Sequence, residues 1–336
     1  MLGLMLGDAV GAVRGDVPDS GILRATSAGQ LACFTAEGAI RASVRMTHKG
    51  ICYPPGVVWH AYCRWAAIQG IAGVKPWSKE NWPDGWLAQI PALSERRGSA
   101  PATVAAIARG APASIDKPAG TSAGSHALIR GLPIGLWGPE IWPSGEMAAE
   151  AAATTHAGTA VDAAALGALA ITELRRRSRT GSATEVSQAM RDAEVIWAEV
   201  KPRSVRPVTD AIAAAAATPR DASQLAQLVP DATAMSILAG AAYLVASFPE
   251  DRKIAEVLGF AAKAPFGRHL APVVGALLGT VYGPDSLPMA WVSRLELAWV
   301  ADVLAHDLVA EILDKPSGSP YFDPPDRHWW DRYPGW

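Results

Sequence analysis

Long alanine-rich stretches constrain the fold of this chain more than any other feature. Residues 148–171 read AAEAAATTHAGTAVDAAALGALAI and residues 209–218 read TDAIAAAAAT. Alanine has the highest intrinsic helix propensity, and its small side chain lets neighbouring helix axes approach closely. Alternating runs of β-branched residues, which would indicate strands, are almost absent. The sequence therefore predicts an all-α fold.

The balance of residue types excludes several classes of function. Of the 336 residues, 50% are hydrophobic and 18% are charged, so the chain can bury a sizeable core. A formal net charge of -2 lacks the basic excess that nonspecific nucleic-acid binding requires, and we expect no nucleic-acid partner. Three cysteines are too few for a disulfide scaffold and fit no zinc motif, which favours a reducing, cytoplasmic setting.

The start of the chain, MLGLMLGDAVGA, is apolar but is interrupted by Asp8. It lacks the basic segment and the small-residue cleavage site of a signal peptide. No apolar run reaches the length of about 20 residues that crosses a bilayer, so we expect no membrane partner. Asp8 itself is expected to be a buried hydrogen-bond acceptor between helix ends rather than a catalyst.

The chain is expected to form one domain with a short tail. No sustained Gly/Ser/Pro linker and no repeat divides residues 1–314, which we assign to a single all-α domain. Residues 315–336 are too rich in proline and aromatic residues to continue as helix. We expect this tail to pack across the domain through Trp329, Trp330 and Trp336 rather than to serve as a binding segment.

Four glycine-rich or polar segments interrupt the helical pattern. In a helical domain such breaks bring backbone N–H groups and helix N-termini toward one point, which suits a phosphate or a diphosphate. Within the first segment, however, the spacing of Gly3, Gly7 and Gly11 favours close helix packing over ligand contact. The four segments span residues 3–12, 95–103, 120–136 and 264–279.

Taken together and in this order, the segments resemble the ADP-ribosylglycohydrolase family. GLMLGDAVGA (3–12) is similar to the family's opening G-x-x-x-G-D-A-x-G-A helix, and Arg97-Gly98-Ser99 with Pro101 resembles its phosphate loop. GSHALIRGLPIGL (124–136) resembles its Gly-Asn-Gly-x-x-Met-Arg-x-x-Pro segment. Thr155-His156 matches its Thr-His motif, and GALLGTVYGPDSLPMAW (275–291) is close to its last signature. The resemblance covers roughly residues 1–300 and implies a compact all-α fold that binds an ADP-ribose-like ligand.

The chain departs from the family where metals are bound. Family members hold two Mg²⁺ ions with a Thr-Asp-Asp motif and a later Asp-x-Asp-Thr. The resemblance places the first motif on Thr35, Ala36 and Glu37, which keeps one carboxylate. Counted back from Gly275, the second motif's acids and threonine fall on Phe266, Arg268 and His269. Since Mg²⁺ prefers carboxylate oxygens in octahedral geometry, we expect the dinuclear site to be lost and no cofactor to be bound.

Two functions of different classes remain open. The first is a metal-independent glycohydrolase that cleaves the N-glycosidic bond of an ADP-ribosyl or related nucleoside-diphosphate conjugate. Glu37 would act as general base or transition-state stabiliser, His269 as acid or orienting partner, and Arg268 as the substitute cation. The second is a pseudoenzyme that binds ADP-ribose, a nucleotide or a protein partner without turnover, with a structural Glu37–Arg268 salt bridge.

Both functions require Glu37, Arg268 and His269 to converge in one cleft. The ligand-binding residues that the resemblance implies around them are Thr35, Gly98, Ser99, Gly124, Ser125, His126, His156, Phe266 and Gly267.

Overall fold

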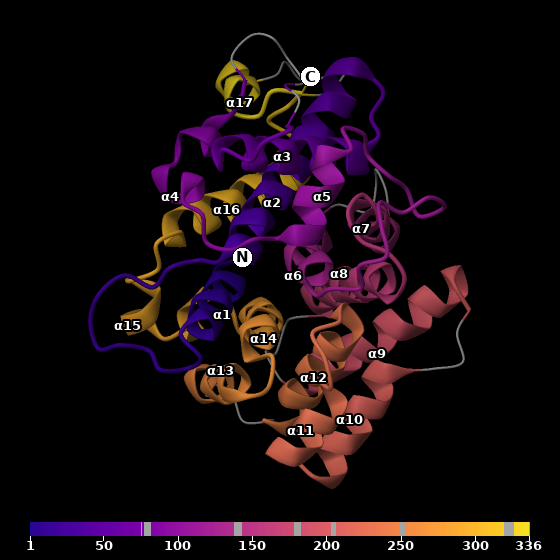
Figure 1. Cartoon of the computed structure of the whole chain (residues 1–336), viewed down its shortest axis with the longest axis vertical. Coiled ribbons are helices and arrows are strands. Elements are labelled where there is room, and N and C mark those ends of the chain that lie inside the picture. The colour runs from indigo at the N-terminus through magenta and orange to yellow at the C-terminus, as the bar shows by residue number, and fades with distance from the viewer. Residues whose placement is uncertain are drawn as a thin grey trace.

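The computed structural model describes most of the chain. It covers residues 1–74, 76, 82–137, 143–177, 183–202, 206–248, 253–318 and 326–335. Within these residues the chain forms α-helices and short 3-10 helices, and no strand longer than an isolated β-bridge. The prediction of an all-α fold is confirmed (Figure 1).

The helices follow one another through connections of varied length, the longest of which follow α1, α3 and α5. In the first half they are α1 (Leu2–Ala12), α2 (Ser27–Lys49), α3 (Pro54–Ile68), α4 (Pro91–Ser94), α5 (Pro101–Ala108), α6 (His126–Gly131), α7 (Ser144–Ala153) and α8 (Thr159–Arg177). In the second half they are α9 (Ala183–Val200), α10 (Pro207–Ala217), α11 (Ala222–Leu228), α12 (Ala234–Ser247), α13 (Ile254–Lys263), α14 (Gly267–Tyr282), α15 (Met289–Val292), α16 (Ala298–Leu313) and α17 (Arg327–Arg332). The 3-10 helices are η1 (Trp86–Gln89), η2 (Leu132–Leu136) and η3 (Pro284–Ser286).

The alanine-rich stretch at 148–171 forms the end of α7 and most of α8. Helix α8 is buried continuously from Ala160 to Leu174 and packs against α7, α9 and η2. Small side chains permit this because they let several helices approach one axis. Three arginines, Arg175 to Arg177, occupy its last turn, where cations face the negative end of the helix dipole.

Helices α1 and α14 lie side by side at backbone contact distance (Figure 1). A Cβ atom at Gly3 would lie 2.1 Å from the carbonyl oxygen of Gly275, and one at Gly7 would lie 2.1 Å from that of Ala271. Close packing, predicted from the glycine spacing, is thereby confirmed for both residues. The contact also brings Gly11, at the end of α1, against the backbone of Arg268 at the start of α14.

The described part of the tail packs on the ends of α2 and α16. The indole N–H of Trp329 donates to Glu311 at 2.8 Å, and that of Trp330 donates to the Ser317 carbonyl at 3.1 Å. Trp336, the third tryptophan expected to anchor the tail, lies outside the described residues. Among the helices that the structure describes, none combines the length and the apolar character needed to cross a membrane.

Candidate functional site

Six segments from distant parts of the sequence meet around a pocket of about 250 Å³. They are the first turn of α2, the loop that enters α5 with its first turn, the loop that enters α6, His156 after α7, Ala232 before α12, and the first turn of α14. The predicted site residues that line the pocket are Gly98, Ser99, Gly124, Ser125, His126, His156, Arg268 and His269. The structure therefore brings most of the predicted ligand-binding set together.

The loop before α5 is shaped by close approach to α2. A Cβ at Gly98 would lie 2.6 Å from the hydroxyl oxygen of Ser27, so glycine lets the loop pass over the start of that helix. Ala100 takes a left-handed conformation with φ of 36°, and Pro101 then begins α5. The first turn of α5 has backbone N–H groups without intrahelical partners, and residues 101–103 line the pocket.

Two buried glutamines hold the same loop in place. The side-chain amide of Gln30 donates to the carbonyls of Ala92 and Glu95 at 3.0 and 2.9 Å. The amide of Gln69 donates to the carbonyl of Leu93. Further along the loop, Arg97 forms an ion pair with Glu296 at 2.8 Å. Sequence analysis missed both glutamines because nothing in their local sequence shows which backbone carbonyls they will meet.

The pocket is positively charged and its imidazoles are neutral. Arg268 is exposed at the pocket, and none of the lining residues is a carboxylate. Burial is the main reason why the pKa of His126 falls to about 3 and that of His269 to about 4, and the nearby charge of Arg268 contributes to both. Burial also holds the pKa of His156 well below 6.5. The Nδ1 atom of His126 is buried without a hydrogen-bond partner among the described residues, so a polar group of a ligand can satisfy it.

Because these histidines are buried and neutral, we expect the folded chain to lose stability in mild acid. Unfolded histidine binds a proton near pH 6.5, whereas folded His126, His269, His156 and, outside the pocket, His60 do so only at much lower pH because burial depresses their pKa. The unfolded state therefore binds more protons between about pH 6.5 and pH 4, and stability falls as the pH falls through that window. Two carboxyls act in the opposite direction: burial raises the pKa of Asp8 to about 6 and also raises the pKa of Glu311.

Urea unfolding at a series of pH values measures this effect. His126→Gln is expected to flatten the pH dependence, whereas His328→Gln, which changes an exposed side chain, leaves it as in the parent chain. A stability that rises as the pH is lowered from 6.5 to 4 would contradict the assignment of buried neutral imidazoles.

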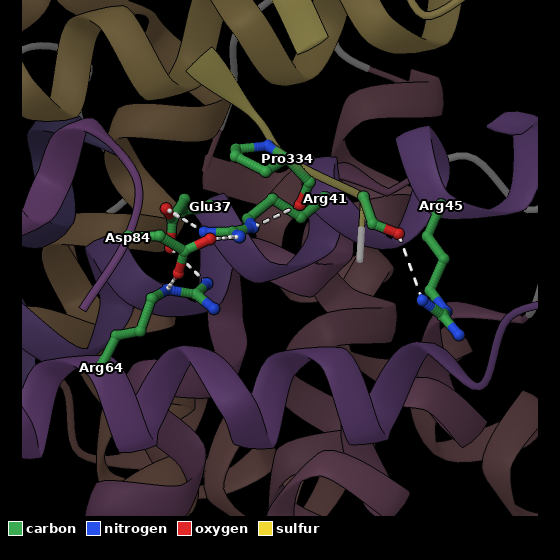
Figure 2. A network of polar contacts seen from close by, with 7 residues as sticks. Glu37, Arg41, Arg45, Arg64, Asp84 and Pro334 are labelled. Carbon is green, nitrogen blue, oxygen red and sulfur yellow. Dashed lines mark hydrogen bonds and ion pairs between the residues drawn. The ribbon is translucent and has the colours of Figure 1, made fainter. Parts of the chain in front are cut away.

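Glu37 lies in a network of ion pairs outside the pocket (Figure 2). The expected convergence of Glu37 with Arg268 and His269 is therefore wrong. Its carboxylate is fully buried and pairs with Arg64 at 2.7 Å and with Arg41 at 3.3 Å. Asp84 completes the network by pairing with Arg41, whose Nε donates to the Pro334 carbonyl at 2.8 Å. The prediction of a Glu37–Arg268 pair is wrong, because Glu37 stands ten residues, about 15 Å of helix, beyond the turn of α2 that reaches the pocket.

The other residues predicted beside Glu37 also lie outside the pocket lining. The Thr35 hydroxyl donates to the Leu31 carbonyl and bonds the Tyr62 hydroxyl at 2.9 Å. Phe266 forms the left-handed N-cap of α14 with a partly exposed ring. A Cβ at Gly267 would lie 2.2 Å from the Ala262 carbonyl, so this glycine serves the packing of α13 on α14.

At the start of α2, Ser27 shares the pocket with Arg268 and His269 in place of the predicted triplet. Ser27 lines the pocket, and Thr26 caps the helix. The Thr26 backbone N–H and hydroxyl both donate to Asp8 at 2.6 Å. Asp8 thus links α1 to the N-terminus of α2, as expected for a buried acceptor. The segment Thr26-Ser27-Ala28, which contains no carboxylate, therefore lies at the pocket end of α2, the place predicted for Thr35-Ala36-Glu37.

The donor set of this pocket does not fit two magnesium ions. The described part of the chain contains no group of three or more His, Cys, Asp or Glu side chains placed to hold a metal. The polar side chains at the pocket are hydroxyls, imidazoles and one guanidinium. Mg²⁺ keeps near-octahedral oxygen coordination and is usually held by carboxylates, which this lining lacks.

The protein is helical and has a pocket lined by glycine-rich loops, neutral imidazoles and a guanidinium. Such a cavity suits a small anionic ligand. The model of the ADP-ribosylglycohydrolase family matches residues 1–317, and the chain belongs to this family. A solved structure titled "ADP-ribosylglycohydrolase-related protein complex" has the same fold, with a TM-score of 0.54 and 20% identity over 91% of this chain and 95% of that one. No curated protein matches the sequence.

Proposed function

We propose that this chain binds the diphosphate-ribose part of an ADP-ribose-like ligand and leaves its glycosidic bond intact. Family membership suggests a glycohydrolase acting on ADP-ribosyl-like substrates. The observation that carries our proposal is the lining of the pocket, which combines Arg268, three neutral imidazoles and the start of α5 without any carboxylate. Such a lining supports binding of an anion but offers little for hydrolysis.

The guanidinium of Arg268 and the backbone N–H groups at the start of α5 account for binding. A guanidinium bonds phosphate oxygens in a fork geometry, and a helix N-terminus favours an anion through its free N–H groups. The cavity of about 250 Å³ is smaller than the range of about 300–1,000 Å³ usual for whole ligands. It therefore suits the phosphorylated ribose, with the nucleoside extending out of it.

The described lining of the pocket offers no suitable base, which argues against turnover. General-base catalysis is most effective when the base has a pKa near the working pH. His126 and His269, with pKa values of about 3 and about 4, are weak bases, and Glu37 is held by two arginines elsewhere. Both functions inferred from the sequence required Glu37 beside Arg268 and His269, and Glu37 instead pairs with Arg41 and Arg64. Binding can still use Arg268, His269 and the glycine-rich loops, whereas hydrolysis loses its only proposed carboxylate, so the geometry favours binding.

Calorimetry with ADP-ribose tests the proposal directly. We expect saturable binding whose affinity is the same in Mg²⁺ and in a chelator, because no metal site contributes. Assays with ADP-ribosyl-arginine, ADP-ribosyl-serine and NAD are expected to release no product. Hydrolysis of any of these, abolished by the chelator, would contradict both the proposed lack of turnover and the poor fit to magnesium.

Arg268→Gln is expected to weaken ADP-ribose binding about tenfold, the loss typical of one charge-assisted hydrogen bond. The variant keeps a polar side chain at this exposed position but shortens it and removes its charge. Lys263→Gln is the matched control, since Lys263 is an exposed cation at the end of the preceding helix that does not line the pocket. Equal loss of affinity in both variants would show a general charge effect and contradict the assignment of Arg268.

A further inference from the structure

Arg130 is a buried cation close behind the pocket. Its side chain is 1% exposed, and its guanidinium carbon lies 4.3 Å from the centre of the Tyr62 ring. One terminal nitrogen donates to the Thr103 hydroxyl at 2.6 Å and the other donates to the Thr155 hydroxyl. No Asp or Glu within the described ranges forms an ion pair with Arg130, so its charge is not offset by a carboxylate.

The contact with Thr155 fixes the direction of the next hydrogen bond. A guanidinium can only donate, so the Thr155 oxygen accepts from Arg130 and keeps its own proton free to donate. That proton can reach Nδ1 of His156 at 2.8 Å or the Ala152 carbonyl at 3.4 Å. The contact with Nδ1 is the shorter of the two and therefore makes the stronger hydrogen bond. Nδ1 of His156 therefore accepts a hydrogen bond from the Thr155 hydroxyl, and the ring's own proton resides on Nε2.

The far edge of the His156 ring faces the pocket. His156 lines the cavity, and a Cβ at Gly124 would lie 3.8 Å from its Nε2 atom. Because Gly124 has no side chain, nothing from this position covers the nitrogen. Burial, with the charge of Arg130 adding to it, lowers the pKa of His156 and keeps the ring neutral. One N–H donor thus points from a rigid, buried ring toward the ligand space.

We propose that Arg130 and Thr155 form a relay that holds His156 as the neutral Nε2–H tautomer, so that His156 donates one hydrogen bond to an anionic oxygen of the ligand. The tautomer follows from the contacts of the ligand-free protein. The nature of the oxygen rests on the proposed function. The uncompensated charge of Arg130 favours an anionic acceptor over a neutral one, because a fixed cation in a buried setting stabilises a nearby negative charge. Arg130 and Thr155 act as positioning residues, since they reach the ligand through His156.

Nitrogen-15 NMR of the histidine rings tests the relay without any ligand. We expect His156 of the parent chain to show a protonated Nε2 and an unprotonated, hydrogen-bonded Nδ1. Thr155→Val keeps the shape of the side chain and removes the hydroxyl, and it is expected to release Nδ1 and yield a mixture of tautomers. Thr155→Ser, which restores the hydroxyl, is expected to restore the single tautomer.

Thr154→Val is the matched control for a lost buried hydroxyl. Thr154 precedes Thr155, is fully buried, and donates to the Ala151 carbonyl at 2.7 Å without touching His156. This variant is expected to leave the His156 tautomer and ligand affinity unchanged. A protonated Nδ1 in the parent chain, or an unchanged tautomer in Thr155→Val, would overturn the relay.

Calorimetry separates the relay from the proposed function. Thr155→Val is expected to weaken ADP-ribose binding about five- to tenfold, the loss expected for one misdirected hydrogen bond, and Thr155→Ser to recover it. If the parent chain has the expected tautomer but binds no ADP-ribose, the proposed ligand is wrong and the relay stands. If ADP-ribose binds but Thr155→Val retains full affinity, the role of His156 as a directed donor is overturned.

Discussion

Replacing Glu37 with glutamine is expected to lower the free energy of unfolding by about 3–5 kcal/mol, the usual loss when one partner of a buried ion pair is removed. Glu37 is fully buried between Arg41 and Arg64, whose side chains are also buried. The variant leaves two guanidinium groups with Asp84 as the remaining carboxylate of the network (Figure 2). Urea unfolding measures the change.

The same variant distinguishes a structural Glu37 from a catalytic one. Because Glu37 stands outside the pocket, folded Glu37→Gln protein is expected to bind ADP-ribose with the affinity of the parent chain. Glu256→Gln provides a surface comparison, since Glu256 pairs with Lys253 at 3.6 Å where both side chains are about half exposed, and a loss below about 1 kcal/mol is expected. A similarly small loss for Glu37→Gln, or a selective loss of ligand affinity, would contradict the network as described.

Gly275→Val is expected to destabilise the chain by about 3 kcal/mol or more, at the upper end of the overpacking range. A Cβ at this position would lie 2.1 Å from the backbone carbonyl of Gly3, which cannot move aside unless α1 and α14 separate. Since α14 begins at the pocket with Arg268 and His269, we also expect weaker ADP-ribose binding by the fraction that remains folded.

Gly259→Ala is the control for this prediction. Gly259 is also inside a helix, α13, but a Cβ there would meet nothing within 4 Å. Alanine is favoured over glycine in an open helical position, so this variant is expected to gain up to about 1 kcal/mol. Thermal unfolding of both variants would contradict the packing of α1 on α14 if Gly275→Val proved as stable as the parent chain.

The helical class and the close packing of α1 were predictable because both depend on local chemistry, whereas α14 as the packing partner was not. Alanine favours helix wherever it is placed in a run, as in α8, and glycines four residues apart form one smooth face of α1. The loops at Gly98 and Gly124 were also predictable, since glycine and proline interrupt helices through their own backbone preferences.

The register of α2 was not predictable from the same reasoning. Two triplets that begin with threonine lie close together in the sequence, Thr26-Ser27-Ala28 and Thr35-Ala36-Glu37. The second is the more obvious candidate for a metal-binding motif because Glu37 carries a carboxylate. Only Arg41, one turn further along the helix, could have been read as its partner. Arg64 and Asp84 come from other segments, and their arrival around Glu37 depends on how α3 and the loop before η1 pack.

The amino-acid sequence by itself determined where helices form, where glycine and proline end them, and which side chains carry positive charge. These properties depend on neighbours within a few residues along the chain. The tertiary structure alone decided that Ser27, Gly98, His126, His156 and Arg268 share one pocket while Glu37 belongs to another network. The physical reason is that packing of the helices sets long-range distances and hydrogen-bond directions, and local spacing along the chain contains no information about either.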